Sequence, residues 1–126
     1  MIKQVVSLFC SAAITAVLLL AGCSKAPAPP PPLAVEQIPA ELDKAFRQSK
    51  QETKDLVSKM NSSLQAKDYT AAYDAVQALG SVPDATTDQQ VLTARAMLTI
   101  YGLLQTAQAQ GDEKATAALE HYKMTR

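Results

Sequence analysis

The sequence predicts an all-α fold, a small antiparallel helical bundle of about four helices. Glycine contributes only 4 of the 126 residues, while alanine and glutamine, which favour helices, are frequent. Apolar side chains recur three and four residues apart along much of the second half of the chain, as expected for amphipathic helices. Glycine or proline interrupts this pattern at residues 80–83 and 111, and these interruptions mark turns between helices.

The chain has room for one domain, preceded by two segments of different composition. We assign residues 1–22 to a signal peptide, residues 23–35 to a proline-rich linker and residues 36–126 to the helical domain. The last range is long enough to bury one modest core.

The first expected helix spans residues 39–66 and begins with Pro39, a residue favoured in the first helical turn. Three of its seven heptad positions are hydroxyl residues, which makes a weak seam. We therefore expect one face to pack on the domain and the polar front half, residues 43–55, to lie in solvent. The alternative is a coiled-coil dimer through residues 40–66. The seam positions are Leu42, Phe46, Ser49, Thr53, Leu56, Met60 and Ser63.

Three further helices are expected after the first. The longest of them is apolar round most of its circumference, and Arg95 is the only charged residue in its centre. A helix of this kind must be covered on several sides, so we expect Leu98 and Tyr101 to be among the most buried residues. The three ranges are 69–79, 88–110 and 112–122, with N-cap candidates at Thr86 and Thr87 before the second.

The N-terminus has the layout of a secretory signal peptide. One positive charge, Lys3, precedes an apolar run from Val5 to Leu20, and small residues follow the run. The run is too short and too weakly flanked for a stop-transfer helix. The residues that close it are Leu20-Ala21-Gly22-Cys23.

Residues 20–23 resemble the lipobox of bacterial lipoproteins at all four positions. The resemblance implies that a diacylglyceryl group is attached to the thiol of Cys23, that the leader is cut before this residue and that the new amino group is often acylated. Two or more acyl chains anchor a protein stably, whereas one holds it only marginally. Ser24 resembles the outer-membrane default of proteobacterial lipoproteins. We therefore expect an extracytoplasmic envelope protein, on the periplasmic face of the outer membrane if the cell is Gram-negative.

The other cysteine supports the same interpretation. Cys10 lies in the leader and Cys23 carries the lipid, so the mature chain is expected to have no thiol for a disulfide or a metal site. The alternative is an uncleaved transmembrane anchor with a chance cysteine at its end.

A proline-rich spacer is expected after the lipidated residue. Residues 24–32 cannot form a helix, because proline lacks the backbone N–H. Polyproline II rises ~3.1 Å per residue, so these nine residues would span roughly 28 Å.

A further pattern begins with Lys67 to Ala72 and returns at the Gly111-Asp112 turn, and in these residues part of the helical region resembles a tetratricopeptide repeat. The resemblance implies helical hairpins that bind peptides or partner proteins in a concave face and are not enzymes. The Ala-Leu pair and the proline stand one residue early for the family, and Glu113 replaces the second tyrosine. Any pair of antiparallel helical hairpins is the alternative. The matching positions are Lys67 to Ala72, Ala78, Leu79, Pro83 and the Gly111-Asp112 turn.

We recognise no catalytic, cofactor-binding or metal-binding set. His121 is the only histidine, and zinc, phosphate-loop and serine-hydrolase motifs are missing. The 12 basic and 12 acidic residues balance without a basic cluster, so nucleic-acid binding is not expected. Tyr69, Tyr73 and Tyr101 are candidates to line a pocket, although packing is the ordinary role of such residues. The carboxylates expected on solvated helix faces are Glu41, Asp55, Asp74 and Glu120.

These observations favour a membrane-anchored envelope lipoprotein that acts as a non-catalytic protein-interaction module. We expect it to bind membrane lipid through acylated Cys23 and an unidentified envelope protein through its helices, as a monomer. The alternative is a structural or spacer lipoprotein that self-associates through residues 40–66.

Lipidation requires the thiol, so Cys23→Ala is expected to abolish incorporation of a labelled fatty acid and to leave an uncut precursor. Metabolic labelling followed by gel electrophoresis measures both effects. Cys10→Ala is the matched control and is expected to label normally. Equal label on the Cys23 variant would contradict the lipobox interpretation.

Overall fold

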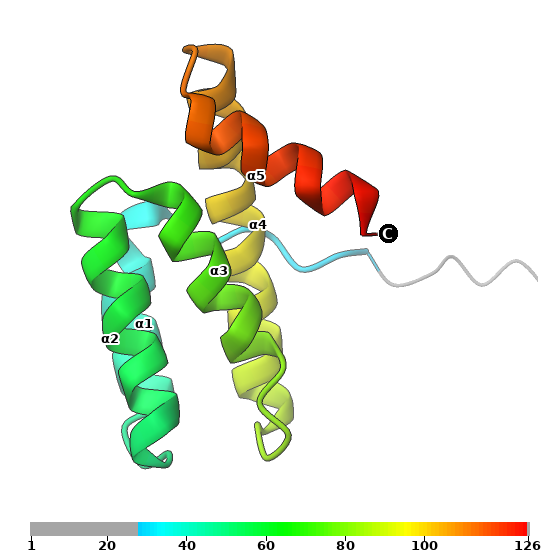
Figure 1. The fold of residues 1–126 in the computed structure, drawn as a ribbon. Coiled ribbons are helices and arrows are strands. Elements are labelled where there is room, and N and C mark those ends of the chain that lie inside the picture. Colours follow the sequence, from blue (N-terminus) through cyan, green and yellow to red (C-terminus); the bar gives the residue numbers. More distant parts are fainter. Residues whose placement is uncertain (1–27, 126) are drawn as a thin grey trace, which may run out of the picture.

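The computed structural model describes residues 28–125 (Figure 1). Within them the chain forms five α-helices, one short 3-10 turn and no strand, which confirms the all-α class. There is one helix more than expected, because the first expected helix is divided in two. The elements are η1 (Val35–Gln37), α1 (Ile38–Ala45), α2 (Gln51–Gln65), α3 (Tyr69–Gly80), α4 (Thr87–Ala109) and α5 (Glu113–Met124).

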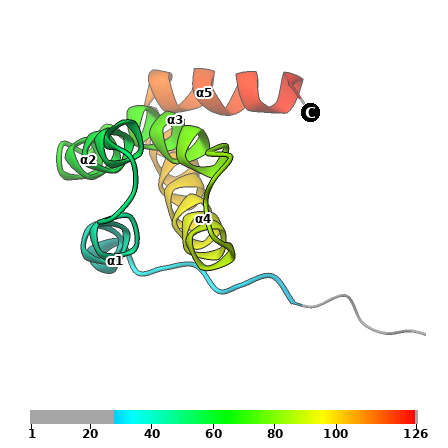
Figure 2. The same ribbon diagram turned by 90° about the horizontal axis from the view of Figure 1, so that it is seen from below.

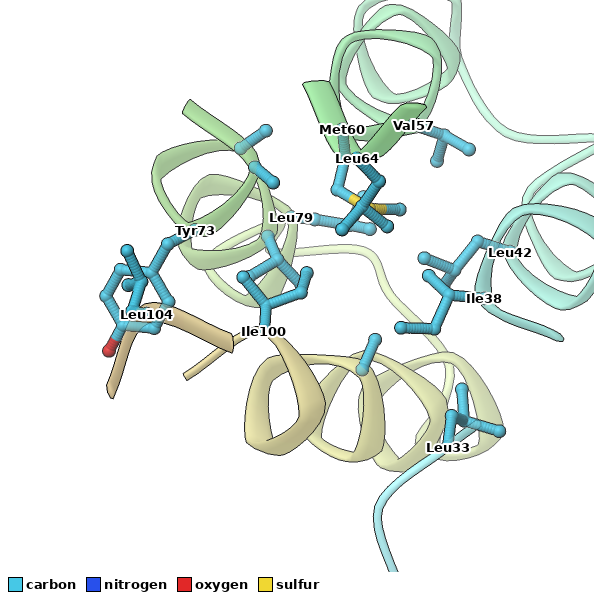
Figure 3. Packing of buried hydrophobic residues seen from close by; sticks show 14 of the residues in the cluster. Leu33, Ile38, Leu42, Val57, Met60, Leu64, Tyr73, Leu79, Ile100 and Leu104 are labelled. Atoms are coloured by element: carbon cyan, nitrogen blue, oxygen red, sulfur yellow. The ribbon is translucent and has the colours of Figure 1, made fainter. Parts of the chain in front are cut away.

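The first four helices enclose one core. α1 packs on α2, α2 on α3, α3 on α4 and α4 on α1, so each helix has two neighbours around a central apolar cluster (Figure 2). α5 lies across α3 and α4 (Figure 1). Side chains from α1 to α4 point toward one another in this core, and Leu33 lies beside them (Figure 3). The largest fully buried side chains are Phe46, Ile38, Leu42, Met60, Leu79, Ile100, Leu104, Val76 and Thr93.

The expectation of a single helix at residues 39–66 is wrong. α1 ends at Ala45, α2 begins at Gln51, and the chain reverses direction between them. Phe46, which follows α1, is only 1% exposed. Its burial, together with the packing of α1 against α2, favours the turn over a continuous helix that would leave one half unpacked. The turn contains neither glycine nor proline. Ser49 followed by Glu52 is a helix-start pattern, although no side chain caps α2 in the structure.

Residues of the heptad seam expected for a coiled coil pack inside the domain. Leu42, Phe46 and Met60 are buried in its own core, and Thr53 is also buried. The polar front half was expected to lie in solvent, yet two of these four residues come from it. Because α1 and α2 turn the seam inward, it is not available to a second chain in this fold.

The side chain of Gln89, in the first turn of α4, forms hydrogen bonds both at the start of α4 and at the end of α1. Its Oε1 accepts a hydrogen bond from the Thr86 N–H at 2.9 Å, and Thr86 Oγ1 accepts one from the Gln89 N–H, which forms a capping box. Its Nε2 donates to the backbone oxygen of Ala45 at 2.9 Å. Carbonyls at the end of a helix lack helical donors, so this bond satisfies one that α1 leaves open.

An ion pair lies near the same end of the bundle. Lys50 Nζ is 3.1 Å from Asp84 Oδ2, and the hydrogen bond from Lys50 lowers the pKa of Asp84 below its ordinary value. Both side chains are more than half exposed, so water and salt weaken the pair. The partly buried bonds of Gln89 are therefore the firmer connection between α1 and α4.

The last three helices agree with the expected ranges to within two residues. The side chain of Asp68 caps α3, and that of Asp112 caps α5; each accepts from a backbone N–H at 3.1 Å. Gly111 has a φ of 89°, a left-handed conformation that glycine adopts without strain. The turn before α5 therefore depends on the glycine that the sequence indicated.

α4 is covered on one side only, so the expected burial of Leu98 is wrong. Leu98 is 46% exposed, Val91 is 45% exposed and Tyr101 is half-buried. The neighbouring helices cover an inner row of side chains, whereas no helix packs on the opposite row within the part of the chain that the structure describes. The apolar composition of α4 thus reflects two separate faces. The inner row consists of Thr93, Ala96, Ile100, Leu104 and Ala107.

Two leucine substitutions on α4 test this difference. Leu104 is fully buried, so Leu104→Ala is expected to lower the free energy of unfolding by about 2–5 kcal/mol. Leu98→Ala removes the same atoms from a half-exposed site and is expected to cost less than about 1 kcal/mol. Urea denaturation of the chain from Ser24 onward measures both. Equal losses would show that α4 has no free face.

Candidate functional site

The predicted lipidation site, Cys23, lies outside the described residues. Over the part of the chain that the structure describes, no helix combines the length and apolar character needed to cross a membrane. The functional surfaces are therefore built from the segment that follows the cysteine and from the helices.

Residues 28–34 run beside α4 and are bonded to it (Figure 2). Arg95 Nε donates a hydrogen bond to the backbone oxygen of Pro31 at 2.8 Å. Thr99 Oγ1 donates to the backbone oxygen of Leu33, whose own N–H donates to the backbone oxygen of Arg95 at 3.4 Å. Leu33 is only 6% exposed and belongs to the core. The end of the expected spacer is thus part of the folded domain.

This docking gives the chain a defined exit from the domain. The residues before Pro31 leave along α4 and not from a loose end at residue 36. Only the part of the linker before this contact can act as a tether between Cys23 and the helices.

Three tyrosines from three helices form a cluster. The ring centroids of Tyr73 and Tyr122 are 5.9 Å apart and the rings meet edge to face. Tyr101 lies 6.1 Å from Tyr73 and 5.9 Å from Tyr122. Such tilted and edge-on arrangements are favourable for aromatic rings. The cluster therefore joins α3, α4 and α5 at one place, whereas Tyr69 is not part of it.

A hollow between α3 and α5, which we call the α3–α5 groove, opens beside this cluster. Its volume is about 630 Å³, and both Tyr73 and Tyr122 line it. Its charged side chains include both acidic and basic groups. The lining also includes Thr70, Asp74 and Gln77 from α3, and Lys114, Ala117 and His121 from α5.

A second hollow lies on the uncovered side of α4. Its volume is about 360 Å³, and it is bordered by Pro30 from the docked segment. All three tyrosines of the cluster line it, together with Met97 and Leu98. Tyr73 and Tyr122 line both hollows, so the cluster lies between the α3–α5 groove and the hollow on α4.

The structure brings some sequence candidates together and separates others. Asp74 and His121 both line the α3–α5 groove, and Tyr73 lies beside them. Glu41, Asp55 and Glu120 are residues outside both of the hollows described above. Within residues 28–125 no group of three His, Cys, Asp or Glu side chains is placed to hold a metal ion.

Other residues of the two surfaces have no functional signal in the sequence. Lys114 and Ala117 line the α3–α5 groove only because α5 crosses α3. Pro30 lines the second hollow because its segment docks on α4. Tyr122 pairs with two other tyrosines, and this pairing depends on how the helices cross.

Comparison of the chain with models of protein families, with curated proteins and with solved structures finds no match. Function is therefore inferred from the residues and their geometry.

The docked segment is expected to stabilise the domain through Leu33. Leu33 is buried, so Leu33→Ala is expected to lower the free energy of unfolding by about 2–5 kcal/mol. Val35, two residues later, is 37% exposed, and Val35→Ala is the matched control with an expected change below about 1 kcal/mol. Urea denaturation measures both. A Leu33 variant as stable as the control would mean that the segment is a free spacer.

Proposed function

We propose that this protein is a lipid-anchored lipoprotein of the cell envelope, and that its α3–α5 groove binds a segment of another envelope protein. The anchor in this proposal is acylated Cys23, and the location is extracytoplasmic, on the periplasmic face of the outer membrane in a Gram-negative cell. The module itself is non-catalytic and takes no cofactor. The observation that carries the binding role is the groove with a tyrosine pair in its lining.

The composition of the groove supports a protein ligand. Its volume of about 630 Å³ falls in the range of common binding pockets, and its lining residues come mainly from α3 and α5. Tyr122 is partly exposed and offers apolar area with a polar tip, the combination that makes tyrosine frequent at protein interfaces. Tyr73 is only 4% exposed and supports the Tyr122 ring from the core. Asp74 and Lys114 offer opposite charges, so the groove suits a segment with both apolar and polar side chains.

The non-catalytic assignment is supported by the roles of the polar groups. The Asp68 carboxylate, at one end of the groove, accepts the backbone N–H of Ala71 as the cap of α3. The hydroxyls that line the groove come from Thr70, Thr125 and the tyrosines, and the lining holds neither serine nor cysteine. The groove therefore lacks the serine or cysteine nucleophile that acyl-transfer chemistry most often uses.

We also propose that helices α2 to α5 derive from tetratricopeptide repeats. These helices alternate in direction and are joined by the short turns at residues 66–68 and 110–112, as in the resemblance. In this chain α1 packs on both α2 and α4 and fills the side between them. We therefore assign partner binding to the α3–α5 groove and not to a concave face between α2 and α4.

Site-specific photocrosslinking in living cells tests the binding role. A photoreactive amino acid at Ala117, an exposed groove residue, is expected to give one discrete crosslinked product. The same amino acid at Ser62, exposed on α2, is the matched control and is expected to give none.

Fatty-acid labelling of both variants shows separately that the anchor is intact. Normal labelling with no product at Ala117, or with equal products at the two positions, would contradict the proposed role of the groove.

A further inference from the structure

The side of α4 that no described helix covers over most of its length has an apolar row, which ends at Tyr101 beside the tyrosines of α3 and α5. Val91, Ala94, Leu98 and Tyr101 follow one another at spacings of three, four and three, so they share one helix face. Val91 and Leu98 are nearly half exposed, and Ala94 is also exposed. We call these four residues the outer α4 face.

The chain that leads to the proposed lipid leaves the domain at the edge of this face. Pro30 lines the same hollow as Leu98 and Tyr101. In both ribbon views the docked segment and the C-terminal end of α5 point to the same side of the molecule (Figures 1 and 2). None of the described helices covers α4 on that side.

The length of the tether places the outer α4 face close to the lipid. Pro30 stands seven positions after Cys23. A chain spans at most ~3.6 Å per residue, so the two residues are no more than about 25 Å apart whatever conformation lies between them. The docked segment is therefore held within this distance of the lipidated residue, close enough for the outer α4 face to reach the membrane surface.

We propose that the outer α4 face rests on the lipid surface, with Leu98 at the boundary between headgroups and acyl chains. This inference depends on the lipidation of Cys23 in the proposed function. The lipid provides the anchorage, and the outer α4 face sets the orientation of the domain.

The chemistry of this side fits a lipid surface. Val91 and Leu98 present apolar area, while Tyr101 and Tyr122 combine a ring with a hydroxyl, the combination that concentrates at membrane interfaces. The lining of the hollow contains no acidic residue that anionic headgroups would repel. Contact through this face leaves the α3–α5 groove to a protein partner.

The size of the surface favours lipid over a second copy of the chain. A stable protein interface uses roughly 20–30 residues from each partner. The hollow on the outer α4 face is lined by seven residues, and the inner row of α4 is turned into the core. A lipid surface needs no such area, because the acyl chains already provide the affinity.

The sequence contains no tryptophan, so a single introduced tryptophan is the only source of tryptophan fluorescence. Full-length Leu98→Trp protein, purified with its lipid, is placed in phosphatidylethanolamine and phosphatidylglycerol vesicles with or without a brominated phosphatidylcholine. Bromine quenches a tryptophan that enters the upper acyl region, so we expect about a twofold loss of emission, given a typical insertion depth of ~5–10 Å. Ser62→Trp, exposed on α2, is the matched control with no expected loss. Val91→Trp repeats the test at a second position of the outer α4 face.

Each other outcome overturns the inference. Unquenched emission from both the Leu98→Trp and the Val91→Trp protein, with normal fatty-acid label on Cys23, would leave the proposed anchor intact and remove the membrane contact. A blue-shifted but unquenched signal from the Leu98→Trp protein that disappears on dilution would assign the outer α4 face to a second copy. Equal quenching of the Leu98→Trp and Ser62→Trp proteins would mean that the domain has no preferred orientation. Absence of the fatty-acid label on Cys23 would contradict both this inference and the proposed anchor.

Discussion

The burial of one face of α4 is the constraint on which the rest of the structure depends. α4 contacts α1, α3, α5 and the turn before α1, so four separate elements meet on it. Ile100 and Leu104 on its inner row are fully buried. At roughly 25 cal/mol per Å² of apolar surface, burial of this row favours the packing of the other helices around it. α2 is held in the bundle through its packing on α1 and α3.

The two faces of α4 divide the molecule into regions with different roles. The inner row stabilises the bundle, and the outer row lies beside the exit of the tether. The tyrosine cluster joins these regions, because Tyr73 comes from the bundle, Tyr101 from α4 and Tyr122 from α5. In the proposed arrangement the domain contacts lipid through one side of this cluster and a protein through the other. A rigid connection between the two sides would let the membrane determine how the α3–α5 groove is presented.

The sequence predicts the fold where the signal is local, and it fails where the cause is tertiary. Gly80, Thr86 and Asp112 identify the ends of helices because these residue types favour helix termini. The turn after Phe46 contains neither glycine nor proline, and it forms through burial against distant helices. Leu98 looks like a core residue in the sequence because a helical pattern does not reveal which neighbours are present. The groove depends on the crossing of α5 over α3, and the docked segment on partners more than sixty residues away.

The central claim is that the segment before α1 is fixed to α4, and hydrogen exchange of the full-length protein in vesicles tests it most directly. The Leu33 N–H donates to the backbone oxygen of Arg95 within a buried contact, although its segment has no regular secondary structure. The account predicts that this amide exchanges as slowly as the core amides of α4, through unfolding of the whole bundle. Exchange of the Leu33 amide at the rate of an unstructured peptide, with α4 still protected, would contradict it.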